Sequence, residues 1–467
     1  MNALVAPVQA PVVPVIGIDL AVTASSELAV ASGSAIESSA RVSSTPRGLT
    51  NGIAKAAAGR SVAIVVESTA MAWFVAAVAA VRSGVSHTMY RVSGRKAAAL
   101  REFYRSHTKT DRIDARVLAR MPAVDDGLQV FSLPSPGQLA LKRLVVTRHR
   151  LTTEATQVSN RLRSLLAWAC PGLVSAAGGV NPGLAAVLGH WPNLRCLAAA
   201  RTGTVARLAD WGLERAAAVH QAAAEAVEFY QGYVDFADVA VELSLLLSQQ
   251  GFLTAQIRTL EARIAELHAA QYPKDPLVSI PGVGPVVAGV VRAVVGDMSR
   301  FTSLASLRAY TGLVPREDSS GQARRRGRIS KAGPSVLRWA LYLAGDAARQ
   351  ADPALAELYR RLMVERGRTH TQAVCAVASH LVGRIWAVGR QGRDYTWRDL
   401  EGNEITKEAA RMIAQSLRVD PQTRARLRSR AEGEPRAPRT RQPKAPQDAT
   451  RPADQLTEEA LGVAADA

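Results

Sequence analysis

The first 130 residues alternate short β-branched runs with Ala-rich segments. Residues 15–18 and 62–66 are continuous apolar runs of strand length, and residues 27–31 supply a partner strand. Residues 70–81 and 95–105 have the apolar spacing of helices. This alternation of strands and helices predicts an α/β domain.

In the middle of the chain, apolar residues recur every seven positions. They are Leu144, Leu151, Val158 and Leu165 in one segment and Leu246, Leu253, Leu260 and Leu267 in another, with Ile257 and Ile264 at intervening heptad positions. This spacing predicts two long helices with coiled-coil seams. We favour an arm that pairs subunits, because the seams are narrow and flanked by charge. Packing inside one subunit is the alternative.

Prolines mark the expected boundaries. A helix carrying residues 110–121 closes the first domain, and a loop with Pro122, Pro134 and Pro136 follows it. Pro273 opens a third region. The predicted organisation is a flexible N-terminus (1–14), an α/β domain (15–130), a helical coiled-coil domain (131–272), a C-terminal domain (273–400) and a mostly disordered tail (401–467).

Composition and charge narrow the function. The 467 residues, 48% apolar and 21% charged, exclude one small domain and a wholly disordered chain. The 58 basic and 40 acidic residues give a net charge of +18. Residues 418–467 hold ten basic and eight acidic residues, so they contribute only +2. The basic excess therefore lies in the body of the chain and predicts a polyanionic partner such as nucleic acid.

The cysteines and the first residues indicate the compartment. Cys170, Cys196 and Cys375 are far apart and form no CxxC motif, which excludes a disulfide framework and a zinc knuckle. The apolar stretch before Asp19 contains prolines and lacks the basic flank of a signal peptide. We expect a soluble cytoplasmic protein with no membrane partner.

Four carboxylates in the first domain are candidates for a common site. Asp19 and Glu67 each end an apolar strand, and Asp111 and Asp114 lie three apart on one helix face. Such a cluster repels itself unless divalent cations neutralise it. Two Mg²⁺ ions about 3.5–4 Å apart, or Mn²⁺ in their place, would suit phosphodiester chemistry. The alternative is that these acids are turn residues and a solvated helix face.

Cations interleave with the helical acids. Lys109, Arg112 and Arg116 surround Asp111 and Asp114, as expected where phosphates approach a metal site. This arrangement strengthens the interpretation as a phosphodiester site.

A glycine turn precedes a predicted helix in the third region. Residues 277–284 read LVSIPGVG, and a helix over 285–295 follows. Gly282 and Gly284 would let backbone N–H groups approach a DNA phosphate, as in half of a helix-hairpin-helix. A tight turn that contacts no ligand is the alternative.

A basic segment follows, with glycines typical of a loop moulded to a nucleic-acid backbone. Its cations are Arg316, Arg324, Arg325, Arg326, Arg328 and Lys331. Ser319 and Ser320 stand within it, and serine becomes a nucleophile only where its proton is drawn off or the attacked phosphorus is activated. By residue type alone, two serines beside a glycine are more often plain loop residues.

These motifs together resemble a known family. KTDRIDAR around Asp111, GID at Asp19 and VVES at Glu67 are similar to the Asp-Glu-Asp-Asp (DEDD) transposases of bacterial insertion sequences, described as bridge-RNA-guided serine recombinases. LVSIPGVG and the basic segment match the family's second signature, and the resemblance spans residues 15–122 and 277–390. It implies an N-terminal RNase H-like (RuvC-like) α/β domain and a C-terminal transposase domain. Together with the heptad spacing and the glycine turn, this predicts an α/β plus α fold with a central coiled-coil helical arm and a mainly helical C-terminal domain that contains a helix-hairpin-helix-like element.

The resemblance also implies residue roles. Asp19, Glu67, Asp111 and Asp114 would be catalytic metal ligands. Ser320, next to Gly321, would be the nucleophile that forms a covalent 5′-phosphoserine link, with Ser319 as the fallback. Two positions depart from the family pattern. The family often has Lys near the first Asp and Asn after SKAG, whereas Leu20 follows Asp19 and Pro334 follows Gly333.

The function that the resemblance implies is DNA transposition by metal-assisted cleavage and rejoining. Its partners would be double-stranded donor and target DNA, a structured guide (bridge) RNA, and further copies of the chain in a dimer or tetramer. Three alternatives stay open: a RuvC-like Mg²⁺ nuclease that uses water, a non-catalytic nucleic-acid-binding protein, and a sugar-kinase-like ATPase. The last lacks a second Gly-rich phosphate loop.

Overall fold

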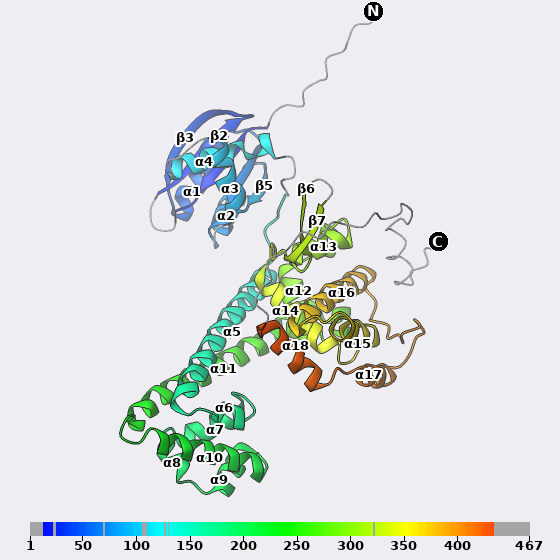
Figure 1. The fold of residues 1–467 in the computed structure, drawn as a ribbon. Coiled ribbons are helices and arrows are strands. Elements are labelled where there is room, and N and C mark those ends of the chain that lie inside the picture. The colour runs from blue at the N-terminus through cyan, green and yellow to red at the C-terminus, as the bar shows by residue number, and fades with distance from the viewer. Residues whose placement is uncertain are drawn as a thin grey trace, which may run out of the picture. The chain divides into compact units, whose positions relative to one another are not determined.

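The protein forms two compact units, Met1–Ser135 and Pro136–Ala467 (Figure 1). The structure, a computed structural model, describes residues 13–21, 25–68, 71–104, 110–125, 128, 130–320 and 323–433. Most of the expected flexible N-terminus, as well as Lys109 and Gly321, lies outside the described residues.

The first unit contains a mixed five-stranded sheet in the order β3-β2-β1-β4-β5. β1 pairs antiparallel with β2 and parallel with β4, while β2–β3 is antiparallel and β4–β5 parallel. This mixed sheet agrees with the expected RNase H-like domain. The strands are β1 (Val15–Asp19), β2 (Ser25–Ser32), β3 (Ala35–Ser43), β4 (Val62–Glu67) and β5 (His87–Val92).

Helices cover both faces of this sheet. Side chains alternate between the two faces along each strand, so the apolar residues of the strands need a covering layer on each side. Ile16 and Ile18 face one core with helices α1 (Pro46–Ala57) and α2 (Ala72–Arg82). Val15, on the other face, packs in a second core with residues of the other two helices. These two helices are α3 (Gly94–Phe103) and α4 (Asp111–Val124).

Three elements of the first unit differ from the prediction or were not predicted. β3 has the mostly exposed, polar sequence AIESSARVS, so its strand conformation depends on pairing with β2. β5 was also not predicted. Pro122 was expected in a loop but lies inside α4. It falls in the last turn of the helix, so the backbone hydrogen bond that proline cannot donate is lost only near the helix end.

The second unit begins with two long helices. α5 (Pro136–Ala169) and α11 (Phe236–Gln271) pack on each other in antiparallel orientation, since Arg148 bonds to Glu261 and Gln250 bonds to Ser159. Short helices pack at one end of this pair (Figure 1). They are α6 (Leu173–Ala176), α7 (Pro182–His190), α8 (Leu194–Ala198), α9 (Thr202–Ala209) and α10 (Leu213–Phe229).

The predicted seams are used inside the chain. Val158 and Leu246 are buried in the core that includes the short helices. Ile264 is buried at the opposite end, in the core of the C-terminal helices. The structure therefore shows the intrachain alternative for these seam residues.

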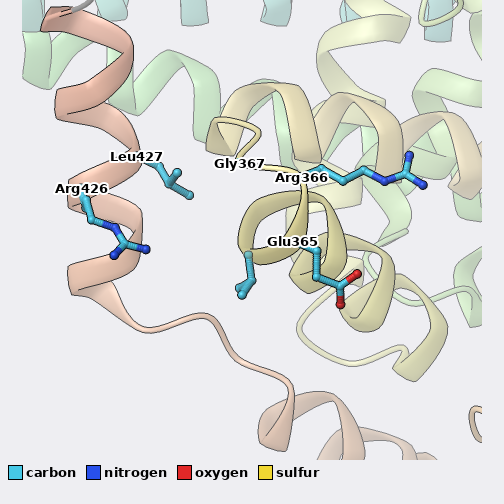
Figure 2. Close-up of a pocket in the computed structure, with 6 residues that line it drawn as sticks. Glu365, Arg366, Gly367, Arg426 and Leu427 are labelled. Carbon is cyan, nitrogen blue, oxygen red and sulfur yellow. The ribbon is translucent and has the colours of Figure 1, made fainter. Parts of the chain in front are cut away.

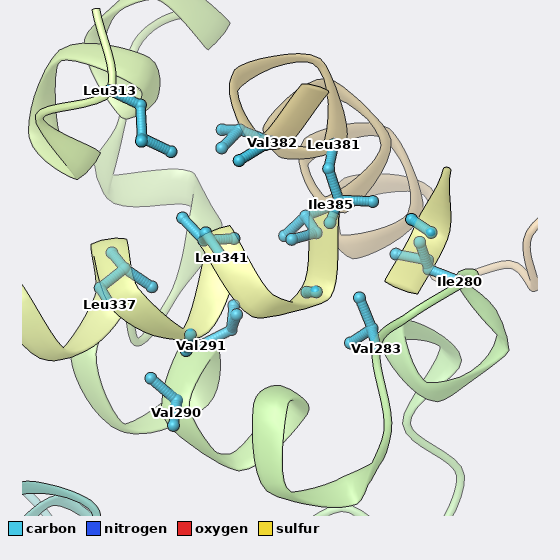
Figure 3. Close-up of a cluster of buried hydrophobic side chains, with 14 of the residues drawn as sticks. Ile280, Val283, Val290, Val291, Leu313, Leu337, Leu341, Leu381, Val382 and Ile385 are labelled. Carbon is cyan, nitrogen blue, oxygen red and sulfur yellow. The ribbon is translucent and has the colours of Figure 1, made fainter. Parts of the chain in front are cut away.

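The C-terminal part is mainly helical, around the core drawn in Figure 3, where Val291, Leu341 and Leu381 meet. Its elements are η1 (Pro276–Ser279), α12 (Pro285–Val294), η2 (Met298–Arg300), α13 (Leu304–Thr311), β6 (Pro315–Ser320), β7 (Ala323–Ile329), α14 (Ser335–Ala348), α15 (Pro353–Arg360), η3 (Arg361–Glu365), α16 (His370–Gln391), α17 (Lys407–Ser416) and α18 (Pro421–Gly433). Among the described helices, none has the length and apolar character needed to cross a membrane.

Helices α17 and α18 occupy a region where a mostly disordered tail was expected. Ala410 and Ala414 are buried on α17, and Leu427 joins the C-terminal core from α18. Figure 2 shows Leu427 beside the π-helical turn η3, with Arg426 next to it. A few apolar anchors thus order a segment whose average composition is that of a solvated tail.

Candidate functional site

The four predicted carboxylates line one pocket of the first unit. The residues around this pocket are Ile18, Asp19, Leu20, Glu67, Ala72, Gly94, Ala98, Arg101, Asp111 and Asp114. These acids come from three elements, β1, β4 and α4, and the fold brings them to a common opening.

Asp19 and Glu67 reach the pocket from the sheet. Each is the last residue of its strand, β1 or β4, and these strands are parallel neighbours. Parallel strands end at the same edge, so both half-buried carboxylates lie at one end of the sheet.

Asp111 and Asp114 reach the pocket from the first turn of α4. Thr110 caps this helix by accepting a hydrogen bond from the N–H of Ile113 at 3.3 Å. Acidic residues in a first turn are favoured by the helix dipole. Asp111 is exposed, whereas Asp114 is only 6% exposed.

Arg101 is a pocket residue that the sequence analysis missed. Its Nε donates a hydrogen bond to Oδ1 of Asp114 at 2.5 Å, and both side chains are largely buried. The available signal was helical spacing, because Gly94, Ala98 and Arg101 share one face of α3.

Gly94 is the second pocket residue that was missed. A Cβ at this position would lie 2.7 Å from Oε1 of Glu67, so the glycine lets α3 begin directly against the carboxylate. Nothing in the sequence pattern distinguishes Gly94 from an ordinary residue at the start of a helix.

Glu27 is a further carboxylate near the site. It lies directly opposite Asp19 in the β1–β2 register and is only 5% exposed. Its Oε1 accepts a hydrogen bond from Arg41 Nε at 2.7 Å, which compensates its charge. Glu27 is not among the residues that line the pocket.

The donor set fits a divalent metal in kind. Carboxylate oxygens are the ligands that Mg²⁺ and Mn²⁺ prefer. As the side chains stand, however, no three His, Cys, Asp or Glu residues in the described part of the chain are grouped closely enough to hold one ion. Asp114 is engaged by Arg101, so joint ligation requires side-chain movement.

The predicted cations of α4 have different surroundings. Arg112 is exposed. Arg116 donates from Nε to Oγ of Ser39 on β3 at 3.1 Å. Lys109 is not among the described residues.

The two predicted phosphate-binding glycines also differ. Gly282 has φ +76°, and a Cβ there would lie 2.2 Å from the carbonyl oxygen of Ala344. Its place against α14 already explains the need for glycine. Gly284 is exposed at the N-cap of α12, and a Cβ at this position would have nothing within 4 Å of it.

The basic segment is a β-hairpin and not the predicted irregular loop. Ser320 ends β6 opposite Ala323, and Ser319 pairs with Arg324. Arg325 and Arg326 lie on β7 opposite Asp318 and Glu317, and Arg328 is also on β7. Side chains of residues 317–328 lie outside the described part.

The base of this hairpin is held by close backbone contacts. The N–H of Lys331, at φ +54°, donates to the carbonyl of Gly312 at 3.1 Å. Arg338 Nη1 donates to the carbonyl of Gly333 at 3.0 Å, and a Cβ at Gly333 would lie 1.7 Å from the carbonyl oxygen of Tyr310. Arg316 and Lys331 are exposed at this base.

Two segments of the chain match known families. Residues 16–171 match a DEDD transposase family of the IS110 type, and residues 274–360 match the transposase family IS116/IS110/IS902. The first match contains the four carboxylates, and the second contains the hairpin with Ser320.

Similar proteins agree with these matches. The chain is 32% identical over 324 residues to a protein of insertion element IS110 from Streptomyces coelicolor, which covers 65% of this chain and 76% of that protein. It is 28% identical over 313 residues to a protein of insertion element IS116 from Streptomyces clavuligerus, covering 65% and 77%. A pilin gene-inverting protein from Moraxella lacunata is 33% identical over 126 residues, covering 27% and 39%. The chain therefore belongs to the IS116/IS110/IS902 family of insertion-sequence transposases.

Proposed function

We propose that this transposase cuts and rejoins DNA strands by metal-assisted attack of Ser320 on phosphorus. The observation that carries the proposal is the common pocket of Asp19, Glu67, Asp111 and Asp114. Matches of the chain to DEDD and insertion-sequence transposases support strand transfer as the reaction. The gene-inverting relative supports DNA rearrangement as the outcome.

The four carboxylates would hold the metal. Divalent ions, which are typical of DEDD domains, supply charge neutralisation at the carboxylates and at the attacked phosphate when bound. Asp19 and Glu67 approach from rigid strand ends, and Asp111 and Asp114 approach from a capped helix. Rigid elements of this kind keep ligands within the small tolerances that catalysis needs.

The covalent step balances without a cofactor such as ATP. Attack by Oγ of Ser320 forms an Oγ–P bond and breaks the P–O3′ bond of the DNA. The serine proton goes to the released 3′ oxygen, and the 5′ phosphate stays on the serine. Rejoining is the reverse reaction with a new 3′-hydroxyl, whose proton returns to Oγ. One phosphoester bond replaces another, so the bond energy is retained.

The basic residues would position the DNA. The cations of the hairpin region are Arg316, Arg324, Arg325, Arg326, Arg328 and Lys331. The antiparallel pairing of β6 and β7 puts four of them on the strand beside Ser320. Arg112 and the N–H of Gly284 would add phosphate contacts, since both residues are exposed.

We further propose that the active assembly is a dimer or tetramer. The carboxylates belong to one unit and Ser320 to the other, so a composite site with Ser320 from another subunit is compatible with the chain's organisation. Val241, Leu245 and Phe252 form an exposed apolar stripe on α11, with 62%, 67% and 64% exposure. Their steps of four and seven residues are those of a coiled-coil seam, for which a second copy of α11 is the matching partner.

A guide RNA is the remaining part of the proposal. It is supported by the resemblance of the sequence motifs and by the net charge of +18. Cleavage of target DNA should then depend on a transcript of the noncoding DNA that flanks the gene. Equal cleavage with and without that transcript would remove RNA guidance from the proposal.

The decisive experiment traps labelled DNA on denatured protein in the presence of Mg²⁺. We expect wild type and Ser319→Ala to form the adduct and Ser320→Ala to form none. An adduct with Ser320→Ala but none with Ser319→Ala would move the nucleophile to Ser319. Cleavage by Ser320→Ala at the wild-type rate would instead favour a water-using nuclease, because the carboxylate pocket lies wholly in the first unit.

The carboxylates are tested by the same assay. Asp111→Asn and Asp114→Asn should keep nucleic-acid affinity and lose strand cleavage, because they remove metal ligands and no phosphate contact. A variant that still cleaves would remove its residue from the site. Binding without nicking by wild type under all metal conditions would favour the non-catalytic alternative.

A further inference from the structure

Arg101 and Asp114 form an ion pair inside the carboxylate pocket. The Nε–Oδ1 distance is 2.5 Å, and the exposed fractions of the two side chains are 17% and 8%. Both residues line the pocket that also receives Asp19, Glu67 and Asp111. The contact therefore sits at the place where the proposed metal ligands meet.

The charges in this pocket are unequal. Among the described residues that line it, Arg101 is the one cation beside four carboxylates. A guanidinium and a divalent ion compete for the same carboxylate lone pairs. An Arg–carboxylate bond is also directional, so it fixes the orientation of Asp114.

The positions of the carboxylates agree with competition between Arg101 and a metal ion for Asp114. Asp114 is bonded to Arg101, and no three candidate ligands in the described ranges are close enough for one ion. Full ligation by Asp114 thus requires its carboxylate to turn away from Arg101. Breaking a buried pair is costly unless the released charge finds a new partner.

A DNA phosphate is a suitable partner for the released Arg101. Arg guanidinium binds phosphate as well as carboxylate, with bidentate geometry for both. A phosphate that enters the pocket would take Arg101 and leave Asp114 free for the metal. The metal alone would leave Arg101 without a partner, and the phosphate alone would leave Asp114 without one.

We propose that Arg101 couples metal loading to DNA binding by exchanging Asp114 for a DNA phosphate. The inference rests on the proposed metal site and adds its regulation. It makes Arg101 a positioning residue, which acts on the metal through Asp114. Premature metal loading, and with it cleavage chemistry without bound DNA, would be disfavoured.

The test measures Mn²⁺ binding by electron paramagnetic resonance, with and without saturating duplex DNA. The full chain carries Ser320→Ala so that strands are not exchanged. We expect DNA to tighten Mn²⁺ binding about tenfold, within the usual range of coupling between sites. In Arg101→Gln, Mn²⁺ should bind more tightly without DNA, and the effect of DNA should fall to near onefold.

Two matched variants make the result specific. Arg82→Gln removes the same charge from an exposed position of α2 that does not line the pocket, so coupling should be unchanged. Arg101→Lys keeps the charge without the guanidinium fork and should give intermediate coupling. If Arg101→Gln lowers thermal stability, Arg101→Lys can be used in its place, because the lysine keeps a cation beside Asp114.

The outcomes separate this inference from the proposed function. Coupling of equal size in wild type and both Arg101 variants would overturn the exchange. So would Mn²⁺ binding that DNA does not change in the wild type. If Mn²⁺ binding persisted undiminished in both Asp111→Asn and Asp114→Asn, the metal site itself would be overturned. Because metal binding is read directly, the result does not depend on Ser320 as nucleophile.

Discussion

Gly17 of β1 lies against the backbone of Ala115 of α4. A Cβ at Gly17 would be 2.2 Å from the carbonyl oxygen of Ala115 and 2.3 Å from the nitrogen of Ala119. Ala29 and Ala31 of β2 pack on the same two alanines. Small residues on both sides therefore set the distance between α4 and the sheet, and with it the distance of Asp114 from the strand ends.

Gly17→Ala should disrupt the site by moving α4. The contacts are to backbone atoms that cannot rotate away, and overpacking typically costs about 1–3 kcal/mol or more. Urea unfolding should show this loss, and strand cleavage should fall with it. Gly189→Ala is the control, since nothing lies within 4 Å of a Cβ there. Wild-type cleavage by Gly17→Ala would show that the position of α4 does not matter.

Gly94→Ala should impair the site without unfolding it. The new methyl group would meet the end of a flexible side chain, Oε1 of Glu67 at 2.7 Å, which can swing away. Displacement of a catalytic group by about 1 Å costs on the order of 10²-fold in rate. We expect slower cleavage at an unchanged melting temperature. Gly203→Ala, near the start of α9 with open space around it, should leave both unaltered.

The second unit should lose stability at low pH as Asp275 becomes protonated. Its side chain is 0% exposed and accepts hydrogen bonds from His268 Nε2 at 2.9 Å and Arg292 Nη2 at 2.6 Å. Burial alone would raise the pKa of Asp275, but these bonds outweigh it and hold the pKa well below its usual range. The folded pKa is thus below the unfolded one of about 3.9, so the stabilisation is present above about pH 4 and is lost as pH falls further.

Asp275→Asn tests this pH dependence. We expect a loss of about 3–5 kcal/mol at pH 7, because Arg292 keeps its charge in a largely buried site without a carboxylate. Urea unfolding between pH 3 and pH 7 should also show that the free energy of unfolding falls less steeply towards low pH than in the wild type. Asp210→Asn, at a helix end with φ +53°, should change stability little, since Asn tolerates this conformation. An equally steep fall in both variants would contradict the role of Asp275.

The exposed stripe on α11 should control self-association. Leu245→Glu with Phe252→Glu places charges on the proposed seam and should convert oligomers to monomers in analytical ultracentrifugation. The two substitutions lie on exposed positions, so the melting temperature of the chain should change little. Phe229→Glu, an exposed residue of α10, serves as the control. A wild-type monomer at all concentrations with DNA would contradict the proposed pairing.

Much of the carboxylate site followed from local patterns. Asp19 and Glu67 were located because each follows a continuous apolar run. Such a run is typical of a buried strand, and the charged residue after it marks the strand end. Asp111 and Asp114 were placed on one helix face by their spacing alone. Helical spacing places Arg101 and Gly94 on one face of α3, but it does not show which side chains lie opposite that face, so both residues were missed.

By itself, the sequence determined the class of the first domain, the two long helices, the basic character and the strand-end and helical positions of the four carboxylates, because each depends on local composition or spacing. Only the tertiary structure decided that the polar β3 is a strand, that the heptad seams pack within one chain, and that α18 is anchored by Leu427. These features depend on contacts between segments far apart in the chain. Backbone pairing and burial supply their free energy, and neither leaves a local pattern.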